Sequence, residues 1–223
     1  LWKTDLLQGH VKPDFASAVG VALANIHSAT MNDPETEINF RTDQIFHSIR
    51  LEPYFEATAR IHSDVADALH KLVLNTQNNR IALVHGDISP KNILIGPEGP
   101  IFLDAECAWY GDPAFDLAFC LNHLLLKCLY RFNTRTKYAV SFKQMADSYL
   151  GAFEEPYTKD IEFRASRLLP GLLLARVDGK SPVEYVTKEN DKSQIRRFAK
   201  TLLITPVSRL EDLCDAWQKE LTS

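Results

Sequence analysis

The sequence predicts a mainly α-helical fold with a small β insertion near its middle, and three observations support this prediction. Apolar residues recur at helical spacing along most of the 223 residues. Three short β-rich runs interrupt that pattern between about residues 81 and 106, and the last two flank a Gly-Pro-Glu-Gly turn. The composition is 45% apolar and 24% charged, which is typical of a globular chain and argues against a disordered or disulfide-stapled one.

Three helices are predicted in the first part of the chain. One begins with Asp14 as its N-cap and carries an apolar stripe to Ile26. A second follows Thr42 and should end near Pro53, because proline breaks a helix interior. The third is expected to run to about residue 75 with four inward side chains, those of Ile61, Val65, Leu69 and Leu72.

The β insertion and the remaining helices follow in order. Strands are predicted at 81–84, 92–95 and 100–103, with the last two joined as a hairpin. Helix resumes with Asp112 as N-cap and Pro113 at the first helical position, a favourable pair for starting a helix. Four further helices are expected, over about 138–149, 161–175, 195–203 and 207–221.

The charge pattern narrows the possible partners. The chain carries a net charge of −4 and no strongly basic segment, which argues against a nucleic-acid partner. No uncharged apolar run approaches the roughly 18 residues of a membrane span, so no membrane partner is expected. Four cysteines without a CxxC pair predict reduced thiols in a cytoplasmic protein. Residues 81–130 hold only two cations, Lys91 and Lys127, among many carboxylates, which are either solvated or suited to a metal.

The β insertion contains the residues best suited to chemistry. Asp87 lies in a loop after a predicted strand, and Asn92 returns the chain to the next strand. A tight hairpin would bring Asp104 back beside Asn92 and Asp87. Carboxylate and amide oxygens that converge in this way form a site of the kind that holds Mg²⁺ with substrate phosphates. An aspartate that is free of the metal is suited to accept a proton from a substrate hydroxyl.

These motifs resemble the aminoglycoside phosphotransferase/choline kinase family. Members of that family have the protein-kinase-like fold and phosphorylate hydroxyl groups of small molecules with ATP. The resemblance implies that this chain is the C-terminal lobe of such a fold and a phosphotransferase with ATP as co-substrate. It rests on three ordered motifs: His85-Gly86-Asp87 with Pro90 and Asn92, then Asp104-x-Glu106, then Gly111-Asp112-Pro113-x-x-Asp116.

The resemblance also implies roles for individual residues. Asp87 is similar to the catalytic base of the family, and Asn92 and Asp104 are similar to its Mg²⁺ ligands, which also hold the nucleotide. Glu106 stands where members often carry a second acidic metal ligand. The string Asp104-Ala105-Glu106 replaces the Asp-Phe-Gly of protein kinases and favours the small-molecule branch.

Three further residues complete the implied catalytic loop. His85 is similar to the histidine that braces the loop, and Asp116 is similar to the aspartate that hydrogen-bonds the loop backbone, a structural role. Ser89 stands where serine/threonine protein kinases carry lysine, so Lys91 is the nearest cation after Asp87. Its ammonium group either approaches the transferred phosphoryl group or reaches solvent.

A kinase also needs a glycine-rich loop and a strand lysine to hold the phosphates. The nine glycines of this chain contain no G-x-G-x-x-G motif. By the resemblance, residues 1–9 are expected to be the end of the interlobe hinge strand and residues 10–223 the C-lobe. The N-lobe would then be a missing partner, and this chain alone should fold but fail to transfer phosphate.

A weaker candidate for the acceptor side comes late in the chain. Arg176, Asp178 and Lys180 follow the apolar run 168–175, where polar side chains at a helix end often line a pocket in this family. The alternative is an ordinary helix C-terminus with a favourable arginine and a glycine stop. The family phosphorylates aminoglycosides, choline, amino alcohols and sugars, and the sequence does not select among these hydroxyl acceptors.

Two other functions compete with phosphoryl transfer. One is a catalytically silent kinase-like interaction module, which has no need for Asp87, Asn92 and Asp104 together. The other is a metal-dependent phosphoesterase with His85 and Asp87 as ligands. It requires several more ligands at strand ends, whereas the other histidines that could serve lie on predicted helices, at His27, His62 and His70.

Overall fold

The computed structural model describes residues 1–222, and helices form most of them. The α-helices are α1 (Trp2–Gln8), α2 (Pro13–Thr30), α3 (Pro34–Asn39), α4 (Asp43–Phe46), α5 (Ala57–Ile61), α6 (Ala66–Asn78), α7 (Pro113–Tyr130), α8 (Arg135–Leu150), α9 (Tyr157–Asp178), α10 (Glu189–Ile204) and α11 (Leu210–Glu220). A π-helix, η1 (His47–Glu56), joins α4 to α5. Short 3₁₀ turns are η2 (Ser63–Val65), η3 (Pro90–Asn92) and η4 (Phe132–Thr134). The mainly α fold with a small β part is therefore as predicted.

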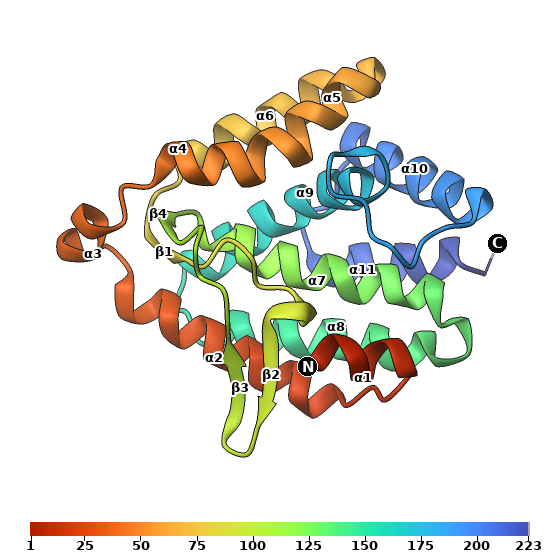
Figure 1. Ribbon diagram of the computed structural model, residues 1–223. Coiled ribbons are helices and arrows are strands. Elements are labelled where there is room, and N and C mark those ends of the chain that lie inside the picture. The colour runs from red at the N-terminus through yellow and green to blue at the C-terminus, as the bar shows by residue number, and fades with distance from the viewer. Residues whose placement is uncertain (223) are drawn as a thin grey trace.

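Helix α7 is the centre of the molecule (Figure 1). It packs against α8 on one side and α9 on another, while α2 covers α8 and α10 covers α9. Every residue from Pro113 to Cys128 is buried, because neighbouring elements surround the helix on all sides. None of the helices formed by residues 1–222 is long and apolar enough to cross a membrane.

Two small antiparallel sheets lie against this helical body. Strands β2 (Ile93–Gly96) and β3 (Gly99–Phe102) form the predicted hairpin, with Ile93 opposite Phe102. It projects beside α1 and α2 (Figure 1). Strand β1 (Ala82–Val84) pairs with β4 (Trp109–Gly111), a strand that was not predicted because its three residues are too few to show a pattern.

The start of α7 follows the predicted capping pattern. The Asp112 side chain accepts a hydrogen bond from the Ala114 backbone N–H at 3.0 Å, and Pro113 occupies the first helical position. Arg164 of α9 donates its Nε–H to the same carboxylate at 3.0 Å. The cap thus also fixes α9 against the start of α7.

The N-terminal residues differ from the prediction. Residues 1–9 were expected to be the end of a hinge strand, but they form helix α1. Trp2 and Leu6 are four residues apart, so a helix buries both against the core, and Gly9 ends it with a φ of 85°. Helix α2 begins at Pro13 with Lys12 as its N-cap, two residues before the expected cap, so Asp14 lies in its first turn and is not its N-cap.

The helix predicted to end near Pro53 continues through it. Pro53 lies inside η1, whose wider turns accommodate a residue without an N–H. In a π-helix each N–H bonds the carbonyl five residues earlier, so the one hydrogen bond that Pro53 cannot make is to the carbonyl of Ser48. Pro53 therefore removes one hydrogen bond of η1 and does not end the helix.

The third predicted helix is broken. Residue His62 leaves the helical conformation between α5 and η2, and its ring bonds Asp178 Oδ2 at 2.8 Å. Ile61 consequently lies outside the core with 61% of its surface exposed, whereas Val65 and Leu69 are buried as expected.

The close approach of α2 to α8 depends on Gly20. A Cβ added there would lie 2.5 Å from the Met145 carbonyl oxygen, a backbone atom that cannot move aside cheaply. Gly20→Ala should lower the free energy of unfolding by about 1–3 kcal/mol despite the better helix propensity of alanine. Val21→Ala, at an exposed neighbour on α2, should change it by less than about 0.5 kcal/mol. Denaturant unfolding of both variants measures this, and a Gly20→Ala protein as stable as the parent would refute the packing argument.

Candidate active site

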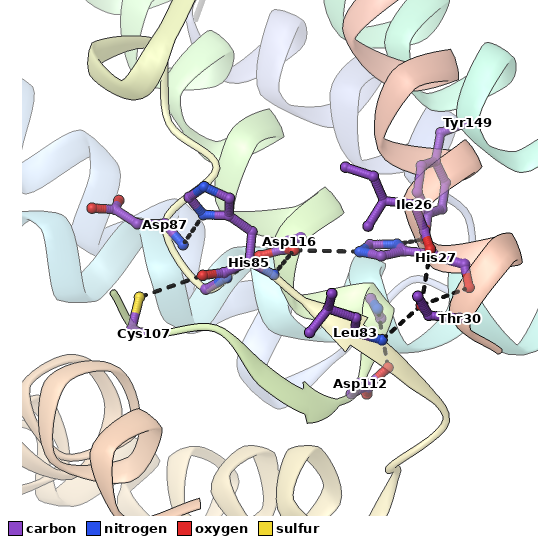
Figure 2. Close-up of polar contacts among 12 residues, drawn as sticks. Ile26, His27, Thr30, Leu83, His85, Asp87, Cys107, Asp112, Asp116 and Tyr149 are labelled. Atoms are coloured by element: carbon purple, nitrogen blue, oxygen red, sulfur yellow. Dashed lines mark hydrogen bonds and ion pairs between the residues drawn. The ribbon is translucent and has the colours of Figure 1, made fainter. Parts of the chain in front are cut away.

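Asp116 holds the loop that carries Asp87 in place through hydrogen bonds to the loop backbone. Asp116 lies in the first turn of α7 and is fully buried. Its Oδ2 accepts a hydrogen bond from the His85 backbone N–H at 2.7 Å, and its Oδ1 accepts one from the Gly86 N–H at 2.8 Å (Figure 2). One carboxylate thus satisfies two consecutive backbone donors that the turn after β1 leaves unpaired.

Asp116 is itself fixed by residues of two other helices. His27 of α2 lies with its Nε2 3.3 Å from Asp116 Oδ2, and its Nδ1 is 2.6 Å from the Tyr149 hydroxyl of α8 (Figure 2). With the proton on Nε2, the imidazole donates to the carboxylate and accepts from the tyrosine. The position of the loop is therefore coupled to three packed helices.

Only glycine suits the position between His85 and Asp87. Gly86 has a φ of 79°, and a Cβ there would lie 2.9 Å from both the carbonyl oxygen and the Sγ of Cys107. The His85 ring lies inside the turn, where its Nδ1 accepts a hydrogen bond from the Asp87 N–H at 3.2 Å. Its Nε2 is buried and has no hydrogen-bond partner within residues 1–222.

The Asp87 carboxylate is nearly buried and lies between two cations. Arg50 Nη2 and Lys91 Nζ are each 3.0 Å from its Oδ2, and Ser89 Oγ donates to its Oδ1 at 3.3 Å. Only 5% of the residue is exposed. Burial of an unpaired carboxylate would be strongly unfavourable, and these partners offset that cost.

Arg50 is a site residue that the sequence did not reveal. It lies on η1, 37 positions before Asp87. Its Nε–H also donates to the Gly86 carbonyl, and its guanidinium lies 5.7 Å from the centre of the Phe119 ring of α7. Its Nη1 donates to the Ile49 carbonyl at 2.8 Å. A single arginine in a helix carries no sequence signal, so sequence reasoning could not find it.

The hairpin brings Asp104 back toward Asn92. The Leu103 N–H donates to the Asn92 carbonyl at 2.9 Å, so Asp104 follows directly after the residue opposite Asn92. The Asn92 side-chain Nδ2 donates to the Asp87 carbonyl at 3.2 Å, and its Oδ1 makes no hydrogen bond within residues 1–222. Asp104 adopts a φ of 67°, which is unusual for a residue other than glycine and is found mainly for asparagine and aspartate.

The donor set near the hairpin fits Mg²⁺. Asp104 and Glu106 are exposed, and neither carboxylate is hydrogen-bonded or ion-paired to another of residues 1–222. Together with Asn92 Oδ1 they offer oxygen ligands, which Mg²⁺ prefers while it keeps several waters. No group of three or more His, Cys, Asp or Glu side chains in the described part of the chain could hold a metal ion.

Arg176, Asp178 and Lys180, the three candidates for the acceptor side, do not form one site in the structure. Asp178 pairs with Arg196 at 2.8 Å as well as with His62, and Lys180 pairs with Glu52 at 2.8 Å. These contacts connect helices and surface loops. Of the three, only Arg176 lines a cavity that Lys91, from the loop that carries Asp87, also lines.

Arg176 shares that cavity with two residues of α7 that the sequence placed in no site. His123 and Lys127 are both buried, and both line the cavity. A larger cavity, of about 490 Å³, lies elsewhere, between α6, α9 and α10. None of the predicted site residues lines it.

The mainly helical body with a small β part is compatible with the fold that the sequence motifs implied. The family model of the phosphotransferase enzyme family matches residues 2–137, which is more than half of the chain. The chain belongs to this family, and the resemblance drawn from its motifs is confirmed. A search of curated proteins gave no match.

Removal of the Asp116 carboxylate tests its role under the loop. Asp116→Ala leaves the His85 and Gly86 amides without an acceptor, so the free energy of unfolding should fall by about 1–3 kcal/mol. Asp147→Ala, at an exposed position of α8, is the matched control and should fall within about 0.5 kcal/mol of the parent. Chemical denaturation measures both variants. Parental stability of Asp116→Ala would mean that other groups hold the loop.

Proposed function

We propose that this protein is an ATP- and Mg²⁺-dependent phosphotransferase that acts on a hydroxyl group of a small molecule. The observation that carries the proposal is the environment of Asp87. This carboxylate lies on a loop that Asp116 fixes, and it contacts two cations. The Asn92 side chain donates to the Asp87 carbonyl, and the Leu103 N–H donates to the Asn92 carbonyl, so the backbone at Asp104 lies near Asn92.

In this proposal Asp87 positions the acceptor hydroxyl and takes its proton. The hydroxyl oxygen forms a bond to the γ-phosphorus, the bond from that phosphorus to the oxygen of the leaving ADP breaks, and the proton ends on Asp87. Because the transition state for phosphoryl transfer is loose, most of the rate enhancement comes from positioning and charge stabilisation. A fixed carboxylate suits that role.

Asn92 and Asp104 would hold Mg²⁺, with Glu106 as a further ligand. The metal supplies charge neutralisation for the phosphates. Lys91 lies within 3.0 Å of Asp87 and is half exposed, so its ammonium group is free to turn toward the transferred phosphoryl group. Arg50 is buried against Phe119 and keeps Asp87 oriented.

We also propose that residues 10–223 act as the C-lobe of a kinase-like fold. The resemblance and the order of strand, loop, hairpin and helix support this assignment. A glycine-rich loop and a strand lysine would be supplied by an N-terminal lobe as partner. Turnover experiments therefore use the full-length gene product.

The role of Asp87 is tested by Asp87→Asn, which keeps the shape of the side chain and removes the proton acceptor. Turnover in the full-length gene product with Mg-ATP and its acceptor should fall by roughly 10²–10⁴. Asp147→Asn, at an exposed aspartate of α8, should keep parental turnover. If Asp87→Asn turned over at the parental rate, Asp87 would not be the base.

The metal ligands are tested by the Mg²⁺ dependence of nucleotide binding. Asp104→Ala removes a charged ligand, so it should weaken Mg²⁺-dependent binding more than Asn92→Ala, which removes a neutral oxygen. Titration of Mg²⁺ at fixed nucleotide, followed by calorimetry, measures the difference. An unchanged Mg²⁺ dependence in both variants would remove the metal site from the proposal.

A further inference from the structure

Four basic side chains line a small cavity next to the loop that carries Asp87. Its volume is about 50 Å³, several times the roughly 10–15 Å³ that one buried water needs. Lys3 of α1, Lys91 of the loop, Lys127 of α7 and Arg176 of α9 all line it, and Glu184 is its one acidic residue. Four elements that are far apart in sequence thus bring positive charge to one place.

The carboxylates nearest to the cavity are already paired with other cations. Glu184 lies 2.5 Å from Lys3 Nζ. Asp87 is shared between Lys91 and Arg50. The two other basic residues of the cavity are Lys127 and Arg176. Within residues 1–222, neither of them has a carboxylate oxygen within 4.0 Å of its nitrogen atoms.

Lys127 is a buried lysine with only weak partners. One per cent of the residue is exposed. Its Nζ donates to the Tyr185 hydroxyl at 3.4 Å and lies 4.7 Å from the centre of the Tyr185 ring. Burial lowers the pKa of Lys127 to about 7. A lysine in this environment would be stabilised by an anion that entered the cavity.

Two further nitrogen atoms of residues that line the cavity have no hydrogen-bond partner among residues 1–222. Arg176 donates Nη1–H groups to the neutral oxygens of Tyr54 and Ser181, and its Nε is buried without a hydrogen-bond partner among residues 1–222. His123 is 6% exposed, and its Nε2 is likewise buried and unpartnered in the described chain. The Tyr185 hydroxyl lies 3.5 Å from His123 Nδ1, and when it donates to that atom, His123 Nε2 carries the proton of the neutral ring. Unsatisfied buried donors are rare in proteins and often mark the place of a ligand.

We propose that this cavity binds an anionic group, a carboxylate or a phosphoryl group, carried by the acceptor. The inference rests on the proposed function, because Lys91 lines the cavity and also contacts Asp87. An acceptor whose anionic group lies against Lys127 and Arg176 would present a hydroxyl to Asp87 on the other side of Lys91. The same charges disfavour the cationic acceptors of the family, such as aminoglycosides and amino alcohols.

Three probes that share one skeleton and differ in charge test this inference. Glycerate, glycerol and 3-amino-1,2-propanediol are titrated into the full chain by calorimetry without nucleotide, and inorganic phosphate and glycerol 3-phosphate are titrated in parallel. At least one anion should bind about tenfold or more tightly than glycerol, and the amine should bind no better than glycerol. Comparison of inorganic phosphate with glycerol 3-phosphate shows whether the cavity prefers a free anion or an anionic group carried on an alcohol.

Matched variants assign the binding to the cavity. Lys127→Met keeps the length of the side chain and should lower the affinity for the anion by about tenfold or more. If Lys127→Met fails to fold, Arg176→Gln should show the same loss of affinity. Lys159→Met, at an exposed lysine of α9, should leave the affinity unchanged. No anion binding by the folded parent, equal binding of glycerol and the anions, or parental affinity in the cavity variants would overturn the inference.

The number of protons taken up on anion binding gives a second readout. A lysine with a purely structural role would take up no proton when the anion binds. The titratable and charged groups around Lys127 are Lys3, Lys91, Arg176, Glu184, Tyr185, His123 and Cys120. A bound anion raises the pKa of Lys127, so at about pH 8 binding should take up roughly half to one proton, measured from enthalpies in two buffers. Lys127→Met should abolish the uptake, and uptake that persists in this variant would contradict the inference.

The outcome is separable from that of the proposed function, because anion binding is measured without ATP. If the full-length gene product transferred phosphate but the cavity bound no anion, the inference about the cavity would be wrong and the proposed function would stand. Anion binding that depends on Lys127, with no Mg-ATP-dependent transfer to any acceptor, would instead reject the proposed function.

Discussion

The structure depends on one buried carboxylate that accepts two consecutive backbone hydrogen bonds. Asp116 fixes the His85 and Gly86 amides at 2.7 and 2.8 Å, and His27 and Tyr149 fix Asp116 in turn. Because these contacts join the loop to the central helix α7 and to its neighbours, the loop cannot shift without loss of core packing. The position of Asp87 is therefore a property of the whole helical body.

Charge is distributed unevenly around that fixed loop. On the hairpin side, Asp104 and Glu106 are exposed and unpaired within residues 1–222, which suits a divalent cation. On the other side, Lys127 and Arg176 lie in a cavity without carboxylate partners in the described chain. Lys91 belongs to both the loop and the cavity. We infer that the two sides serve different ligands, the metal with its nucleotide on one and an anionic acceptor on the other.

Sequence reasoning was most successful where short motifs determine local geometry. The cap at Asp112, the hairpin with its Gly-Pro-Glu-Gly turn and the loop contacts of Asp116 all follow from residues close in sequence or in a family motif. It failed where tertiary contacts override local preference. Residues 1–9 form a helix because Trp2 and Leu6 pack on the core, and η1 passes Pro53 because a π-helical turn tolerates it. Arg50, His123 and Lys127 could not be predicted, since only the packing of distant elements turns them toward the site.

The central claim is that this chain takes part in the transfer of a phosphoryl group to a hydroxyl of a small molecule. The most direct measurement is ³¹P nuclear magnetic resonance of the full-length gene product with Mg-ATP and a panel of hydroxy acids, sugars and amino alcohols. The account predicts a new phosphomonoester resonance that grows in step with ADP, and it predicts this for a hydroxy acid. ADP that appears only together with inorganic phosphate, or no reaction with any acceptor in the panel, would contradict it.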